Sequence, residues 1–124
     1  MEIRRTVPYE QMPAVHAGSS CLVLASLPVW FWEEQFGMVL AEAMASGLPV
    51  LASTSGGIPE VGGDAFTYFS PGDWVALAQA LAAGPLSRPP GERARYDPAL
   101  IERYSDRAAA ERLRGAYRAL LTTA

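Results

Sequence analysis

Residues 30–50 read Trp-Phe-Trp-Glu-Glu-Gln-Phe-Gly-Met-Val-Leu-Ala-Glu-Ala-Met-Ala-Ser-Gly-Leu-Pro-Val, and this stretch decides the fold. Residues 38–46 are a run of good helix formers, preceded by Gly37, whose backbone allows a tight approach. Gly47 suits a left-handed C-terminal cap, and Pro49 prevents the helix from continuing. The stretch therefore predicts a loop, a helix over 38–46 and the entry to a strand.

Two acidic residues flank the start of this predicted helix: Glu34 lies just before it, and Glu42 lies inside it. The first amides of a helix have no intrahelical partner and sit at the positive end of the helix dipole, so the amides of residues 36–39 suit a phosphate. A carboxylate accepts two hydrogen bonds side by side, so Glu42 suits a ribose diol and Glu34 the hydroxyls of a second sugar. Phosphate between two diol-binding groups describes a nucleotide-sugar.

The whole string is more specific than the spacing of the two acids. It reads Glu-x-Phe-Gly-x-x-x-x-Glu-Ala-Met-Ala-x-Gly-x-Pro-Val from Glu34, and Gly-Gly-Ile-Pro-Glu follows at residues 56–60. At these residues the sequence resembles the C-terminal domain of GT-B retaining glycosyltransferases of the GT4 type, and the resemblance runs from Val7 to Tyr117.

The resemblance implies an α/β fold with a Rossmann-like, doubly wound parallel sheet and a role for each motif residue. Glu34 and Gln35 would contact the donor sugar, Glu42 would bind the ribose, and a loop containing Gly56 and Gly57 would face the donor cleft. The phosphate-binding amides would be those of Phe36, Gly37, Met38 and Val39. Gln35 stands where the family often has Gly, and Ala25 stands where Pro is frequent.

The resemblance also implies a reaction. The substrate would be a nucleotide-sugar such as UDP-hexose or GDP-hexose, and the intact enzyme would transfer the hexosyl group with retention, without a metal ion or other cofactor. No catalytic residue is assigned to this chain, because GT-B enzymes act between two domains and the acceptor site belongs largely to the other one.

Composition limits the class of protein. The chain has 124 residues, half of them hydrophobic, and a net charge of −3 with Arg as its basic residue type, so we expect one globular domain over 1–124 and no nucleic-acid partner. Cys21 is the single cysteine and lies in an apolar run, which favours a buried structural thiol. The start of the chain shows no secretion signal, so the cytoplasm is the expected compartment.

The remaining pattern alternates strands and helices, as in a parallel sheet. Strands are predicted at residues 2–6, 21–25, 49–53 and 65–69. Helices are predicted at 9–17, from Pro59, and at 74–83, 98–104 and 106–121, with Asp73 and Ser105 as N-caps. His16, without a second ligand nearby, is expected to be structural. Helix 74–83 has Val75, Leu77, Ala78 and Leu81 at packing positions, and the last helix carries an apolar stripe of Ala109, Leu113, Tyr117 and Leu120.

Compared with the family, the domain is expected to be N-terminally truncated. Two strands, their helices, and a Lys and an Arg that hold the donor pyrophosphate have no counterpart here. Segment 21–25 would then have an unpaired edge, to which either strand 2–6 or a second copy of the chain could add. The expected partners are thus the N-terminal domain of the intact enzyme, a nucleotide-sugar and a second copy, with the isolated chain inactive.

Three alternatives remain open. The chain could be a non-catalytic remnant or interaction module that keeps the fold without binding donor. A flavodoxin-like receiver is less favoured, because no acidic cluster follows the first strand. Trp30, Phe31 and Trp32 could stack on a sugar or base, or cover the sheet or a neighbouring domain, and covering is the favoured interpretation.

Overall fold

The protein is built on a three-stranded parallel sheet. The computed structural model describes residues 3–122, and its strands are β1 (Leu22–Leu24), β2 (Val50–Ser53) and β3 (Thr67–Phe69), in the order β1-β2-β3. Leu22 pairs with Val50, and Leu51 pairs with Thr67. All four residues of β2 are buried, as expected for a central strand covered on both faces. This confirms the predicted parallel α/β sheet.

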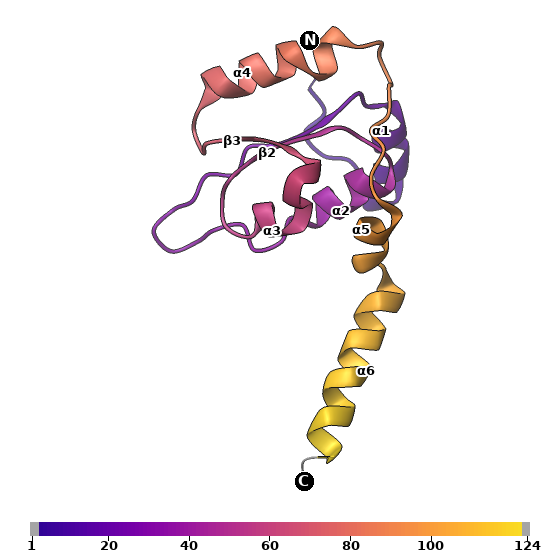
Figure 1. The fold of residues 1–124 in the computed structure, drawn as a ribbon. Helices are drawn as coiled ribbons and strands as arrows, with labels where there is room; N and C mark the ends of the chain where they lie inside the picture. Colours follow the sequence, from indigo (N-terminus) through magenta and orange to yellow (C-terminus); the bar gives the residue numbers. More distant parts are fainter. Residues whose placement is uncertain (1–2, 123–124) are drawn as a thin grey trace.

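Helices lie on both faces of the sheet (Figure 1). α4 (Trp74–Ala83) lies above it in this view, and α2 (Met38–Ala45) and α3 (Ile58–Gly62) lie below it. The fold is therefore the Rossmann-like, doubly wound arrangement, in a short version. The other helices are η1 (Tyr9–Gln11), α1 (Met12–Gly18), η2 (Gly63–Ala65), η3 (Pro85–Ser87), α5 (Pro98–Arg103) and α6 (Asp106–Thr122).

The core lies between α2 and the sheet. Leu40, Ala43 and Met44 of α2 are buried against residues of β2 and against Ile58 at the start of α3. Burying a large aliphatic side chain stabilises a fold by about 1.5–3 kcal/mol, so α2 is held mainly by this apolar face. The helix on which the candidate site depends is thus firmly attached to the sheet.

The predicted helix ends are confirmed. Gly47 follows α2 with a φ of 67°, the left-handed cap expected of it. Pro59 lies in the first turn of α3. Asp73 accepts a hydrogen bond from the Ala76 amide at 2.9 Å, and the Ser105 hydroxyl accepts one from the Ala108 amide at 3.1 Å. Local capping chemistry therefore sets these boundaries.

The first predicted strand is wrong. Residues 3–8 have no regular secondary structure, and Glu2 lies outside the described residues. Ile3 is the only strongly apolar residue of the strand predicted at 2–6 and is 66% exposed. A strand exists only through its partner, and this segment has neither a buried face nor a strand to pair with. Among the described residues, β1 consequently remains an edge strand that pairs only with β2.

The segment after η3 crosses back to α1 and α2. The Arg93 guanidinium donates to the carbonyls of His16 and Ser19, at 3.3 and 3.0 Å, at the C-terminal end of α1. The Tyr96 hydroxyl donates to the Leu48 carbonyl, and burial raises the pKa of Tyr96 to about 12. The last carbonyls of a helix have no donor within the helix, and a cation at this end can donate to them. The segment that contains Arg93 and Tyr96 therefore holds α1 against the body of the domain.

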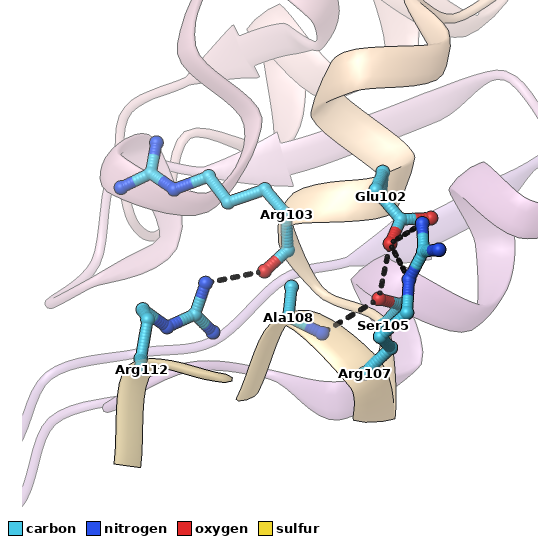
Figure 2. A network of polar contacts seen from close by, with 6 residues as sticks. All are labelled: Glu102, Arg103, Ser105, Arg107, Ala108 and Arg112. Carbon is cyan, nitrogen blue, oxygen red and sulfur yellow. Dashed lines mark hydrogen bonds and ion pairs between the residues drawn. The ribbon is translucent and has the colours of Figure 1, made fainter. Parts of the chain in front are cut away.

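A small polar network sets the direction of the last helix. Figure 2 shows Glu102 of α5 accepting hydrogen bonds from Ser105 at 2.9 Å and from Arg107 at 2.8 Å, while Arg112 donates to the Arg103 carbonyl at 2.8 Å. The two donors to Glu102 hold the pKa of its carboxyl below the ordinary value. The network joins α5 to the start of α6, which then extends away from the sheet (Figure 1).

The apolar faces of α4 and α6 are less covered than their spacing suggests. No residue of α6 is buried, and Leu113, Tyr117 and Leu120 of its stripe are exposed. On α4, Leu77 and Leu81 are half-buried, whereas Val75 and Ala78 are exposed, so the predicted packing face is only partly formed. Helical spacing identifies an apolar face but not what covers it.

Candidate functional site

The loop between β1 and α2 places Glu34 at the N-terminus of α2. Gly37, the N-cap, has a φ of 67°, and a Cβ there would lie 3.1 Å from side-chain atoms of Leu24 and Leu40. The left-handed backbone conformation favours glycine at this position, and any Cβ would also push the two leucine side chains slightly aside. The Glu34 carboxylate accepts a hydrogen bond from the Gly37 amide at 3.0 Å. An acid at this end of a helix is favoured by the helix dipole.

The predicted phosphate-binding amides are not all free. The Gly37 amide already donates to the Glu34 carboxylate. In α2, Leu40 is the first residue whose amide has a backbone acceptor, because it donates to the Gly37 carbonyl at 2.8 Å. Within residues 3–122, the amides of Phe36, Met38 and Val39 have no protein acceptor. Three of the four predicted donors are therefore available to an anion at the positive end of α2.

The paired glycines bring the loop after β2 against the Glu34 loop. The Gly57 amide donates to the Glu34 carbonyl at 2.8 Å. A Cβ on Gly56 would lie 2.1 Å from the Glu34 carbonyl oxygen, and one on Gly57 would lie 2.2 Å from that of Gln35. The sequence predicted a close backbone approach to a ligand; the approach that the structure contains is to the neighbouring loop. Gly56 and Gly57 thereby position Glu34 and Gln35.

Glu42 faces Tyr9. The Tyr9 hydroxyl donates to Glu42 Oε1 at 3.1 Å, and this hydrogen bond raises the pKa of Tyr9. The sequence offered no indication of this contact, because the two residues belong to elements far apart in the chain. Glu42 therefore points toward the N-terminal segment, and its carboxylate already binds one hydroxyl group.

Two cavities meet at this pair. The first has a volume of about 440 Å³ and is lined by Tyr9, Glu10, Met12, Pro13, His16, Glu42, Ala45 and Ser46. The second, of about 280 Å³, is lined by Tyr9, Phe36, Met38, Ala41, Glu42, Ala45 and Tyr104. Because Tyr9 and Glu42 line both, a ligand can extend from the N-terminus of α2 past Glu42 toward α1.

The walls of these cavities are mainly apolar. His16 is 4% exposed, with Nδ1 3.4 Å from the Ser46 hydroxyl, which agrees with a structural role. Phe36 and Tyr104 pack edge to face with ring centroids 5.2 Å apart, and the Arg103 guanidinium lies 5.6 Å from the Tyr104 ring centroid. Apolar walls with a few polar groups are typical of a small-molecule site.

The remaining loop residues singled out in the sequence are exposed. The Gln35 side chain is exposed and donates to the Glu33 carbonyl at 3.1 Å. Trp30, Phe31 and Trp32 are exposed, so they do not cover the sheet, and that they cover a neighbouring domain stays a prediction. Among residues 3–122, no cluster of three or more metal-ligating side chains is present, and no helix is long and apolar enough to cross a membrane.

A parallel α/β sheet with a helix N-terminus and two glycine-containing loops at the carboxyl ends of its strands defines a Rossmann-like ligand-binding domain. The sequence model of the family "Glycosyl transferases group 1" matches residues 3–96. The chain therefore belongs to this family, and its fold is that of a partial GT-B C-terminal domain.

Characterised relatives agree with this family. The chain is 42% identical over 62 residues to a D-inositol 3-phosphate glycosyltransferase of Mycolicibacterium vanbaalenii, a match over 45% of this chain and 14% of that protein. It is 45% identical over 69 residues to an N-acetyl-alpha-D-glucosaminyl L-malate synthase of Bacillus anthracis, over 51% and 18%. It is 36% identical over 72 residues to an O-antigen chain mannosyltransferase B of Escherichia coli, over 58% and 18%. The matched region thus spans less than a fifth of each of these relatives.

Proposed function

We propose that this domain binds the nucleotide-sugar donor of a GT4-type retaining glycosyltransferase, with a UDP-hexose or GDP-hexose as the substrate class. The observation that carries the proposal is the arrangement of Glu34 just before α2, the free amides at the start of α2 and Glu42 within α2. Phe36, Met38 and Val39 offer unpaired amides at the N-terminus of α2, and Glu34 and Glu42 lie on either side of them.

The order of these groups matches the order of groups in a nucleotide-sugar. The diphosphate would lie at the amides, the ribose at Glu42 and the hexose at Glu34 and Gln35. The amides would stabilise the charge that builds up on the departing diphosphate, which is an electrostatic contribution to catalysis. Most of the acceptor site would come from the N-terminal domain of the intact enzyme. The remaining phosphate contacts would come from the Lys and Arg that the family carries in the first two strands and helices of its C-terminal domain. The cytoplasm stays the compartment predicted from the sequence.

The competing function is a non-catalytic interaction module, and one observation favours it. Both acids already have a partner inside the protein: Glu34 binds the Gly37 amide and Glu42 binds the Tyr9 hydroxyl. A donor would have to share Glu34 with Gly37 and displace Tyr9 from Glu42. The two functions therefore differ in whether nucleotides bind at all.

A nucleotide titration monitored by NMR distinguishes donor binding from the non-catalytic interaction module. UDP, GDP, ADP and their sugar conjugates are added while the amide signals of Phe36, Met38 and Val39 are recorded. Saturable shifts that disappear in Glu42→Ala, and persist in a Glu111→Ala control on exposed α6, support donor binding. No response at millimolar nucleotide supports the interaction module.

A further inference from the structure

The loop between β1 and α2 presents two aromatic side chains at its tip. Val29 and Trp32 exchange backbone hydrogen bonds in both directions, at 2.9 and 3.0 Å, and so close a tight turn with Trp30 and Phe31 between them. The two rings pack edge to face with centroids 5.1 Å apart, yet Trp30 is 94% and Phe31 73% exposed. Figure 1 shows this loop projecting from the side of the molecule. We call Trp30 and Phe31 the aromatic tip.

The aromatic tip stands on a fixed base. Two residues beyond the turn, the Glu34 carbonyl accepts a hydrogen bond from the Gly57 amide, and the Glu34 carboxylate accepts one from the Gly37 amide. These bonds tie the loop to the loop after β2 and to the start of α2. The same short segment therefore carries both the exposed rings and the acid proposed to contact the donor sugar.

Charge limits what can bind at this tip. The loop between β1 and α2 contains Glu33 and Glu34 and no basic residue, and no Arg occurs between Arg5 and Arg88 in the sequence. Anionic lipid headgroups and nucleic acids are held by Arg and Lys, so this loop offers them repulsion instead. Exposed aromatic rings in a loop that also carries two acidic residues suit a neutral sugar, because sugar C–H groups pack on a ring face and sugar hydroxyls donate to carboxylates.

We propose that the aromatic tip is a stacking platform for the neutral sugar acceptor of the transfer reaction. Trp30 supplies the larger ring face, Phe31 packs against it edge to face, and Glu33 is the carboxylate that follows them first in the sequence. The acceptor role rests on the proposed function, because it is inferred from the fact that the same loop carries Glu34, the residue proposed to contact the donor sugar. Sugar binding at the tip itself needs no donor and is tested separately.

Tryptophan fluorescence reports directly on this platform. The chain has three tryptophans, at 30, 32 and 74, so a Trp32→Phe/Trp74→Phe double variant leaves Trp30 as the only emitter. Methyl glucosides, methyl mannosides and their disaccharides are titrated into this variant. The expected result is a saturable blue shift of the Trp30 emission, because a stacked sugar excludes water from the indole ring.

Calorimetry with the same sugars identifies the residue responsible. Trp30→Ala should weaken binding about tenfold or more through loss of the ring face, whereas Trp74→Ala, which removes another exposed indole on α4, should leave it unchanged. No response to any of these sugars overturns the proposal. A blue shift with neutral phosphatidylcholine vesicles but not with sugars also overturns it, in favour of a lipid surface. The nucleotide titration tests the donor site separately. If the sugars bind and the nucleotides do not, the donor site is rejected and sugar binding at the aromatic tip stands.

Discussion

The Gly57 amide donates to the Glu34 carbonyl across 2.8 Å, and this bond joins the two loops that follow β1 and β2. Both loops follow carboxyl ends of adjacent parallel strands, the edge where open α/β sheets bind their ligands. The contact requires that neither Gly56 nor Gly57 carries a side chain. The position of Glu34, and with it the candidate donor site, therefore depends on two glycines that need not touch a ligand.

Gly57→Ala should destabilise the fold and displace Glu34. The new Cβ would lie 2.2 Å from the Gln35 carbonyl oxygen, which is backbone and cannot move aside cheaply. Overpacking of this kind costs about 1–3 kcal/mol, measurable by urea unfolding. Gly115→Ala on α6 is the matched control: no atom lies within 4 Å of its Cβ, and alanine favours a helix, so its stability should be unchanged or higher. Equal effects of the two substitutions would show that the loops are not in contact.

Tyr9→Phe should strengthen nucleotide binding. The Tyr9 hydroxyl occupies Glu42 Oε1 at 3.1 Å, so a ribose must displace it, and removing it frees the carboxylate while keeping the ring. This hydrogen bond lies on the exposed surface, so the dissociation constant for UDP or GDP should fall modestly, by less than about tenfold, in an NMR titration. Weaker binding in this variant would mean that the phenol hydroxyl contacts the nucleotide and does not compete with it.

The sequence predicted the elements whose ends are marked by local chemistry. α2 begins after Gly37 and ends before Gly47, and Asp73 and Ser105 cap their helices, because a turn or cap depends on a few consecutive residues. The strand at 2–6 was wrong because strand formation depends on a partner elsewhere.

The candidate site was predictable only in part, for the same reason. Residues 34–39 and Glu42 were placed together by a single loop and helix. Tyr9 was missed because its contact with Glu42 joins distant segments. The exposed positions of Trp30 and Phe31 were also missed, because apolar side chains are expected to be covered and nothing local shows that a tight turn carries them outward.

The junction of α5 and α6 should loosen in acid. Hydrogen bonds from Arg107 and Ser105 hold the pKa of Glu102 below its ordinary value. A depressed carboxyl pKa contributes stability above the pKa of the unfolded chain, and this contribution is lost as the pH falls through the folded-state value. Amide exchange at the start of α6, corrected for its intrinsic pH dependence, should therefore accelerate in acid. In Glu102→Gln it should be fast at neutral pH already, whereas Glu111→Gln should behave like the wild type.

Stability should depend on α2 far more than on α6. Leu40 is fully buried, so Leu40→Ala should cost about 2–5 kcal/mol in urea unfolding. Leu113 is 55% exposed on α6, and Leu113→Ala should change the unfolding free energy by no more than about 0.5 kcal/mol. A large loss at Leu113 would show that the apolar stripe of α6 is covered in solution, by another part of the chain or by a second copy.

The free edge of β1 should let the chain self-associate. Leu22 donates its amide to the Pro49 carbonyl at 2.9 Å, and alternation along the strand turns the Val23 N–H and C=O toward the other side. Within residues 3–122 no strand pairs with that side. Exposed strand edges pair with other chains, so sedimentation velocity should show a weight-average mass that rises with protein concentration.

Val23→Pro distinguishes edge pairing from other modes of association. Proline removes the outward N–H of Val23 and leaves the bonds of Leu22 and Leu24 to β2 in place, as edge strands tolerate. The variant should sediment as a monomer at concentrations where the wild type associates, with its far-UV circular dichroism retained. Tyr117→Glu tests the competing surface, since it places a charge on the exposed stripe of α6 and leaves β1 unchanged. If Tyr117→Glu abolishes association and Val23→Pro does not, the copies meet through α6, and the β1 edge is not the contact.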